Sequence, residues 1–322
     1  MIRPFDWRDV GLLHRLRARG LALDCQQACC HGVHALQHAL LGALAPGGLA
    51  CTLVARPPDG DQPPAVAQFV HHGGETPARL TFFGPPEALD DNNGTALLEA
   101  LCKAAGGRGA RNLVAEVDEH SPAFESLRQA GFAIYARQHI LRCEADSPAA
   151  PRGRRAAAES AWRAQTAANG PAIHQLYLNL VPVLVQQIEP PPGRGGRGLV
   201  HWREGELLGY IDLERGPLGV WAQPHFHPAA EQAHELLQAF LRSLDGGRSR
   251  PVYVCVRSYQ GWMRAALEAL GFKCGASQAV MVKRLAVGVR RPARAPLPAL
   301  EGTRSEATTP FAHAAPRPDR TE

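Results

Sequence analysis

The strongest constraint on this sequence is an internal repeat with a spacing of 140 residues. A Gly-Phe pair precedes a predicted strand at residues 131–132 and again at residues 271–272. Each pair follows an apolar, β-like run, at residues 113–117 and 252–256, and each run follows a helix-like segment. Self-similarity at a domain-sized period indicates a duplication. We therefore expect two similar lobes in one molecule.

The net charge of +5 comes from two segments of biased composition rather than from the predicted lobes. Residues 147–158 carry +3 and residues 288–322 carry +2, which leaves the predicted lobes neutral. A protein that binds nucleic acid usually carries a basic stripe on the fold itself. We therefore expect no nucleic-acid partner.

The sequence gives no sign of export or of membrane insertion. The first ten residues are charged and lack an apolar signal core, and no run approaches the ~18 apolar residues of a membrane span. The eight cysteines are scattered along a large, core-rich chain, which favours reduced thiols over a disulfide framework. We expect a cytoplasmic protein without a membrane partner, whose oligomeric state the sequence does not predict.

One segment gathers metal-binding residue types at helical spacing, namely Cys25, Cys29, Cys30, His34 and His38. Side chains of this kind bind Zn²⁺ when two separated segments surround the ion. No second cysteine pair lies nearby in the sequence, and one helix cannot easily enclose a tetrahedral ion. We predict no metal and interpret the cluster as buried thiols with solvated histidines.

Composition divides the chain into four parts. We expect an N-terminal domain over residues 1–143, a linker rich in Pro, Ala and Arg over 144–159, a C-terminal domain over 160–287, and a disordered tail over 288–322. Each domain is predicted to run helix, helix, three strands, helix, strand, helix, strand. Asp9 and Asp24 are predicted to cap the first two helices, and the second helix is predicted to continue to the turn at residues 46–48.

This order of elements, with a Gly-Phe pair before the last strand, resembles the GNAT family of acyl-CoA-dependent N-acetyltransferases. The start of the chain, Ile2, Arg3 and Pro4 followed by Asp9, also looks like a GNAT first strand and helix. The resemblance implies an α/β fold with a mixed sheet, built as two tandem GNAT-like lobes. It also implies transfer of an acyl group, expected to be acetyl, from acyl-CoA to an amine of a small molecule or peptide.

The resemblance further implies a loop after the fourth strand whose backbone N–H groups hold the pyrophosphate of acyl-CoA at a helix N-terminus. The family's run there is Gln/Arg-x-x-Gly-x-Gly/Ala. In the first half, residues 89–94 match only at Gly94, and Asp90 and Asp91 place negative charge beside the phosphate. In the second half, residues 228–233 retain only the final Ala233.

We choose the first half as the cofactor lobe, because Asn93, Gly94 and Thr95 leave an open helix N-terminus. The predicted cofactor is acetyl-CoA, as a co-substrate. The predicted cofactor-binding residues are Phe83, Asn92, Asn93, Gly94 and Thr95.

Proton transfer requires further residues. GNAT enzymes often protonate the departing thiolate with a Tyr four residues before the Gly of the Gly-Phe pair, where this sequence has Leu127 and Leu267. Neither leucine can donate a proton, and we interpret both as core residues. A base that deprotonates the amine is sought among polar residues at strand ends, where we rank Glu116 and His225 first as catalytic residues. The others considered are His71, His72, Glu214 and His227.

Two functions stay open at this point. One is an N-acyltransferase, and the other is a binding protein on a GNAT-like scaffold that has lost the phosphate loop and the acid Tyr. The aromatic residues of the second half, Tyr177, Trp202, Tyr210 and Trp221, either line a ligand cleft or, as is commoner, fill the core.

Overall fold

The computed structural model describes residues 1–44, 48–57, 63–73, 76–145, 161–193, 195–230, 232–244 and 250–285, all within one compact unit. The predicted tail and nearly all of the predicted linker lie outside the described residues, so the four-part division stays a prediction. None of the described helices combines the length and apolar character needed to cross a membrane.

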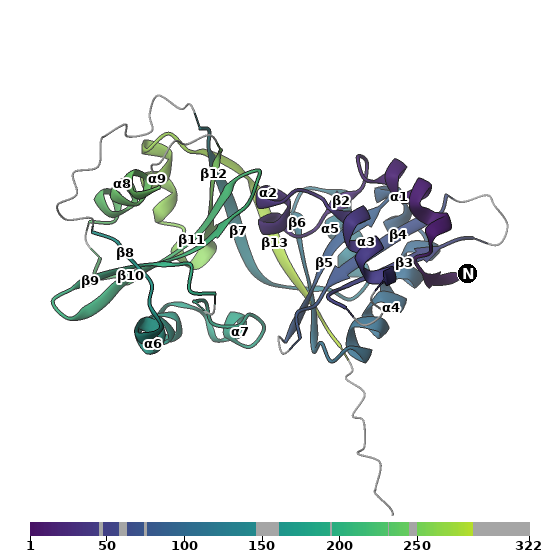
Figure 1. The fold of residues 1–322 in the computed structure, drawn as a ribbon, viewed down its shortest axis with the longest axis horizontal. Coiled ribbons are helices and arrows are strands. Elements are labelled where there is room, and N and C mark those ends of the chain that lie inside the picture. Colours follow the sequence, from purple (N-terminus) through teal and green to yellow (C-terminus); the bar gives the residue numbers. More distant parts are fainter. Residues whose placement is uncertain are drawn as a thin grey trace, which may run out of the picture. The chain divides into compact units, whose positions relative to one another are not determined.

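The first half follows the predicted order of elements, with two short strands, β1 (Ile2–Pro4) and β2 (Leu21–Ala22), in addition (Figure 1). Its other strands are β3 (Ala50–Ala55), β4 (Ala65–Val70), β5 (Pro77–Gly84), β6 (Asn112–Asp118) and β7 (Ala133–Cys143). Its helices are α1 (Val10–Leu16), α2 (Cys25–Cys30), α3 (Ala35–Leu44), α4 (Asn92–Gly107) and α5 (Pro122–Gln129), with 3-10 turns η1 (Trp7–Asp9) and η2 (Pro86–Asp90).

The second half repeats this order. Its strands are β8 (Arg163–Ala164), β9 (Leu199–Arg203), β10 (Glu206–Arg215), β11 (Val220–Phe226), β12 (Val252–Arg257) and β13 (Lys273–Arg284). Its helices are α6 (Gly170–Leu180), α7 (Val183–Gln186), α8 (Ala233–Ser243) and α9 (Met263–Ala269), with 3-10 turns η3 (Ala167–Asn169) and η4 (Ser258–Gln260).

The second predicted helix begins as expected but does not run to residue 46. Asp24 caps α2 by accepting the Gln27 N–H at 3.0 Å. The helix then ends at Cys30, and Gly32 adopts a left-handed φ of 85°, which side chains disfavour. The predicted single helix is therefore two helices, α2 and α3.

The two Gly-Phe pairs occupy equivalent turns. Gly131 and Gly271 have left-handed φ values of 84° and 86°, which explains why both copies have a glycine there. The strands that precede these turns also occupy equivalent positions, since β6 lies parallel to β5 and β12 lies parallel to β11. The predicted duplication is confirmed.

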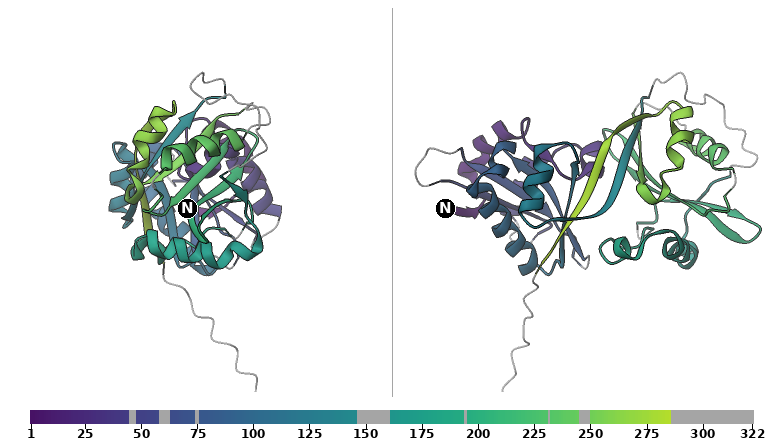
Figure 2. Two further views of the ribbon diagram at one scale, coloured as in Figure 1. Left: turned by 90° about the vertical axis from the view of Figure 1, so that its left-hand side faces the viewer. Right: turned by 180° about the vertical axis from the view of Figure 1, so that it is seen from behind.

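The last strands of the two halves are exchanged. The sheet order is β1-β3-β4-β5-β6-β13-β7-β12-β11-β10-β9-β8, so β13 completes the sheet of the first half and β7 completes that of the second (Figures 1 and 2). Where β7 and β13 pair, Gln138 faces Gln278, its equivalent 140 residues later, and donates a hydrogen bond to it at 3.0 Å.

The hydrophobic cores follow the exchange. The core between the first sheet and α4 and α5 includes Ala279 and Met281 of β13. The core beneath α8 and α9 includes Leu141 and Cys143 of β7. Each sequence half thus supplies core residues to the other lobe, and we use "first lobe" and "second lobe" for the two packed units that result.

Candidate functional site

Each lobe contains two parallel strands that separate after a short pairing. β5 and β6 pair only through residues 77–79 and 112–114, and β11 and β12 only through residues 220–222 and 252–254. Beyond these residues the strand edges of each pair no longer bond to each other. The two openings are therefore the places where either lobe could accept a ligand between its strands.

In the first lobe the chain closes this opening itself. β2 pairs with β5, so that Leu21 and Ala22 lie opposite Phe83 and Phe82. Leu23 continues the contact: its N–H donates to the Thr81 carbonyl at 3.2 Å, and its carbonyl accepts the Glu116 N–H of β6 at 2.8 Å. The backbone groups that an incoming ligand would need are occupied by the protein's own segment.

The predicted phosphate loop is also capped from within. Asn92, Asn93, Gly94 and Thr95 form the first turn of α4, and Asp91 caps it by accepting the Gly94 N–H at 2.8 Å. A Cβ added to Gly94 would overlap the Ala88 carbonyl oxygen, so close packing against η2 accounts for the glycine. Phe83 is fully buried in the first core. Binding of acyl-CoA by these residues stays a prediction. In the structure the Gly94 N–H already bonds the Asp91 side chain.

The equivalent region of the second lobe is not closed in this way. Among the described residues, no backbone segment bonds to the edge of β11 beyond Ala222 on the side of β12. The N-cap of α8 is Gln232, whose side chain makes no capping hydrogen bond. One side chain crosses the opening, where Gln260 donates to the Phe226 carbonyl at 3.1 Å.

His225 lies on β11 beside this opening. It is 3% exposed, with its ring stacked near Tyr210 and edge-on to Tyr177 at centroid distances of 6.1 and 6.3 Å. Its Nδ1 is buried without a hydrogen-bond partner. Burial lowers the pKa of His225 to about 4, with a smaller lowering by Arg257 that the charge of Glu189 opposes. The imidazole is therefore neutral at pH 7.

Arg257, at the end of β12, is a buried cation. Its Nη2 donates to Glu189 Oε1 at 2.6 Å, and the Tyr135 hydroxyl donates to the same oxygen at 2.6 Å. Its Nε and Nη1 are buried without partners. Burial raises the pKa of Tyr135, and the charge of Glu189 adds to this. Strand exchange creates this contact, because Tyr135 lies on β7.

Glu116, the other predicted base, is buried on β6. Its Oε2 accepts the Cys25 N–H at 2.9 Å, and its Oε1 lies 3.6 Å from Arg79 Nη1. Burial raises the pKa of Glu116 and the charge of Asp24 raises it further, while Arg79 and Arg257 oppose the rise.

The charge of Arg257 acts on both Glu116 and His225. The structure therefore gathers the two predicted bases, one from each half, around one polar cluster. We call it the central network, and it consists of Arg79, Glu116, Tyr135, Glu189, His225 and Arg257. Sequence reasoning missed four of these residues, and the only available signal was the charge of Arg257 at the end of an apolar run.

The remaining predicted base candidates lie elsewhere. Glu214 binds Arg197 at 2.9 Å and contacts His31 at 3.3 Å. His71 is buried, His72 is exposed, and the Nδ1 of His227 accepts the Ala229 N–H.

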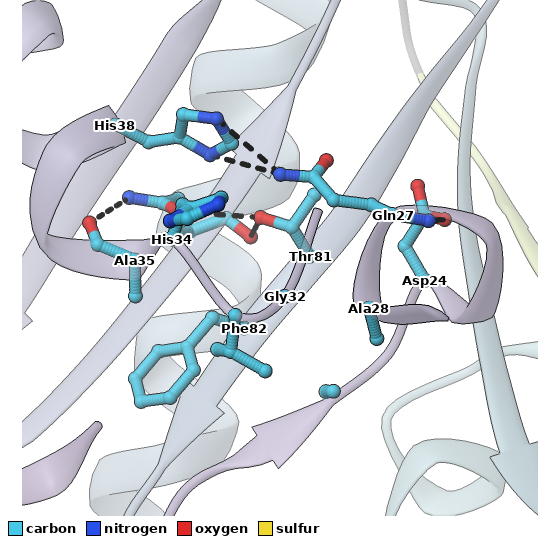
Figure 3. Close-up of a pocket in the computed structure, with 12 residues that line it drawn as sticks. Asp24, Gln27, Ala28, Gly32, His34, Ala35, His38, Thr81 and Phe82 are labelled. Atoms are coloured by element: carbon cyan, nitrogen blue, oxygen red, sulfur yellow. Dashed lines mark hydrogen bonds between the residues drawn. The ribbon is translucent and has the colours of Figure 1, made fainter. Parts of the chain in front are cut away.

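The cysteines and histidines that are clustered in the sequence lie in two different environments in the structure. The Cys25 thiol donates a hydrogen bond to Gln278 Oε1 at 3.2 Å, and Cys30 packs against Trp221 and Cys255 of the second lobe. His34 and His38 instead line a polar cavity with Gln27, Gln68 and Thr81 (Figure 3), whose free volume of about 10 Å³ suits one water molecule. In the described part of the chain, no three metal-binding side chains come together closely enough to hold an ion.

We expect His225 to make stability fall between about pH 6.5 and pH 4. The unfolded chain takes up the imidazole proton near pH 6.5 and the folded chain only near pH 4, so the unfolded state binds more protons in this window. The free energy of unfolding should therefore drop by about 3 kcal/mol as the pH falls across the window. Urea unfolding of wild type and of His225→Phe would measure this, because only the wild-type contribution titrates. Equal pH dependence in both proteins would contradict it.

Comparison with known proteins identifies the fold. No protein-family model and no curated protein sequence matches the chain. A tandem GNAT protein from the clavulanic acid biosynthesis pathway, solved without acetyl-CoA, aligns at a TM-score of 0.52 and 18% identity over 88% of this chain and 98% of its own. A GCN5-related N-acetyltransferase from Sphaerobacter thermophilus aligns at 0.53 and 15% identity over 88% and 95%.

The chain thus has the fold of tandem GNAT proteins, and the predicted fold class is confirmed. At these sequence identities the likeness establishes the fold alone.

Proposed function

We propose that the protein is an acyl-CoA-dependent N-acyltransferase whose second lobe holds the acyl-CoA at the opening between β11 and β12. The asymmetry between the lobes carries this proposal. The first opening is closed by β2 and its helix is capped by Asp91. The second opening is not bridged by described backbone, and the side chain of Gln232, the N-cap residue of α8, makes no capping hydrogen bond.

An uncapped helix N-terminus favours a phosphate group because its N–H groups and dipole face the anion. One of the similar structures is an N-acetyltransferase, which supports acetyl as the acyl group, and a small-molecule or peptide amine remains the proposed acceptor. Of the two predicted bases, Glu116 is the one that would hold an abstracted proton more tightly, since burial raises its pKa whereas burial lowers that of His225 to about 4.

Calorimetric titration of the Gln232→Asp variant with acetyl-CoA should show which lobe binds the cofactor. The new carboxylate would cap α8, so the melting temperature should hold or rise. It would also compete with the pyrophosphate, and acetyl-CoA affinity should fall by roughly tenfold, with less effect at high salt. The matched variant Asp91→Asn keeps a capping residue in the first lobe and should leave affinity unchanged.

Each other outcome has a definite meaning. Tighter binding by Asp91→Asn with no effect of Gln232→Asp would assign the cofactor to Asn92–Thr95 in the first lobe. Absence of wild-type binding at millimolar acetyl-CoA would overturn the transferase proposal.

The alternative is a binding protein without catalysis, and two observations favour it. Leu127 and Leu267, which replace the family's acid Tyr, are fully buried in the two cores. Glu235 in the first turn of α8 also opposes a phosphate. Acetyl-CoA binding without release of free CoA across a panel of amines would support this alternative.

The proposed location is the cytoplasm, because all eight cysteines are free thiols in the structure. Absence of nucleic-acid and membrane partners stays a prediction from the neutral lobes and the lack of an apolar span in the sequence.

A further inference from the structure

A groove of about 450 Å³ lies on the first lobe, and none of its lining residues belongs to the central network. Its walls come from the end of β1 with η1, from α3, from the start of β3, and from Arg108, which follows α4. Small-molecule sites in proteins have volumes of about 300–1,000 Å³ and are mostly apolar with a few placed polar groups. The groove falls within this range.

Two features of the sequence produce the groove. The edge strand β1 pairs with residues 53–55 of β3 and the Phe5 N–H bonds the Thr52 carbonyl at 3.0 Å, so the backbone pairing on this edge stops short of Ala50 and Cys51. The helix above it presents the small residues Ala39, Gly42 and Ala43. Gly42 brings α3 close to β3, since an added Cβ would lie 2.9 Å from the Ala50 carbonyl oxygen. The hollow therefore has closely packed and mostly apolar walls.

Arg108 gives the groove a fixed positive charge. Its Nη1 donates to the Gly48 and Ala50 carbonyls at 2.8 and 3.1 Å, and its guanidinium lies 5.4 Å from the centre of the Phe69 ring. No carboxylate of the described residues pairs with it within ion-pair distance, and its Nε and Nη2 have no described partner. Its charge reaches the groove wall, where it opposes the rise that burial causes in the pKa of Cys51.

An oriented guanidinium with free N–H groups suits a carboxylate, which it can meet with two parallel hydrogen bonds. The apolar walls suit a hydrocarbon body attached to that carboxylate. The groove's other charged residue, Asp6, is exposed to solvent.

We propose that this groove binds a small apolar carboxylate of about eight to twelve non-hydrogen atoms, with its anionic end at Arg108. This site is separate from the acyl-CoA site proposed in the second lobe and does not depend on it.

Calorimetric titration of the full chain with hexanoate and with 3-phenylpropanoate would test the proposal. Both should bind with 1:1 stoichiometry and a Kd of about a millimolar or tighter. The neutral analogue hexanamide should bind at least about tenfold more weakly, because it lacks the charge that Arg108 recognises. Trp7 lines the groove and is 60% exposed, so its fluorescence should report binding, and Trp7→Phe should remove that signal while calorimetric binding persists.

Three variants locate the site. Arg108→Gln should weaken hexanoate binding by about tenfold or more, and Arg108→Lys by less, since the charge remains but the paired geometry is lost. Asp6→Asn removes a like charge and should leave affinity equal or increased. Ala43→Phe fills the groove while Arg108 itself is retained, and it should abolish binding, which keeps the test valid if Arg108→Gln disturbs the turn at Gly48.

Equal binding of hexanoate and hexanamide would overturn the proposal, as would preference for hexylamine or no saturable binding of either carboxylate. Unchanged affinity in Ala43→Phe would also overturn it, because the ligand would then bind elsewhere. Titration of the same protein samples with acetyl-CoA tests the acyltransferase proposal independently. Failure of the carboxylate proposal can therefore be told apart from failure of the acyltransferase proposal.

Discussion

Met281→Ala should destabilise the first lobe, although Met281 lies in the second half of the sequence. Met281 is fully buried, and β13 places it opposite Ala115 of β6 within the first core. Removing a buried side chain of this size leaves a cavity, and the free energy of unfolding should fall by about 2 to 5 kcal/mol. Urea unfolding would give the loss, and hydrogen exchange of peptides from β4 to β6 would locate it.

Leu141→Ala is the reciprocal control. Leu141 lies in the first half of the sequence, is fully buried on β7, and belongs to the core beneath α8 and α9. A similar loss is expected, but with increased exchange in β10 to β12. If each substitution instead loosened the lobe of its own sequence half, the exchange of β7 and β13 would be disproved.

The exchange shows what local sequence signals can and cannot predict. The Gly-Phe turn and the strand after it were correctly predicted in both halves, because a left-handed glycine and an apolar run depend on nearby residues alone. The same signals fit a last strand that returns to its own sheet or one that crosses to the other. The choice rests on pairings between distant segments, such as Met281 with Ala115 and Leu141 with Val254.

The closure of the first lobe was equally hidden. β2 has only two residues, Leu21 and Ala22, which is too short for a periodic pattern to reveal. Its pairing with Phe82 and Phe83 appears only in three dimensions. Gly94 attracted attention as a phosphate-loop glycine, and the structure gives it a packing role against Ala88.

Two of the six residues of the central network could be picked out from the sequence. Glu116 stood out as a carboxylate inside an apolar strand, and His225 as a histidine at a strand end. Their common neighbour Arg257 pairs with Glu189 across 68 residues, and Tyr135 reaches Glu189 across 54. Partnerships at such separations follow from the packing of α7 and the exchanged strand, which the composition of each segment does not encode.

The pairing of Glu189 with Arg257 leads to the second large effect, which is expected for Glu189→Gln. The side chains of Arg257 and Glu189 are 5% and 13% exposed, and an arginine cannot lose its proton to escape burial. Without the carboxylate, the buried cation loses its hydrogen-bonded counter-charge, and the Tyr135 hydroxyl loses a charged acceptor. The free energy of unfolding should fall by about 3 to 5 kcal/mol, measured by urea unfolding.

An exposed ion pair in the same protein provides the matched control. Glu125 and Arg128 are 55% and 57% exposed and lie 3.1 Å apart, so Glu125→Gln should change stability by no more than about 1 kcal/mol. The double variant Glu189→Leu/Arg257→Met should recover most of the loss, because it removes both buried charges together. A cost for Glu189→Gln as small as that for Glu125→Gln would show that Arg257 is already solvated.

The double variant also tests what the central network does. A network that only holds the lobes together should tolerate this apolar replacement without loss of acetyl-CoA binding or of acyl transfer. A network that serves the proposed reaction should lose transfer even where stability and acetyl-CoA affinity are restored, because both Glu116 and His225 would then lack the charge of Arg257. Stability and turnover measured on the same double variant therefore separate a structural ion pair from a functional one.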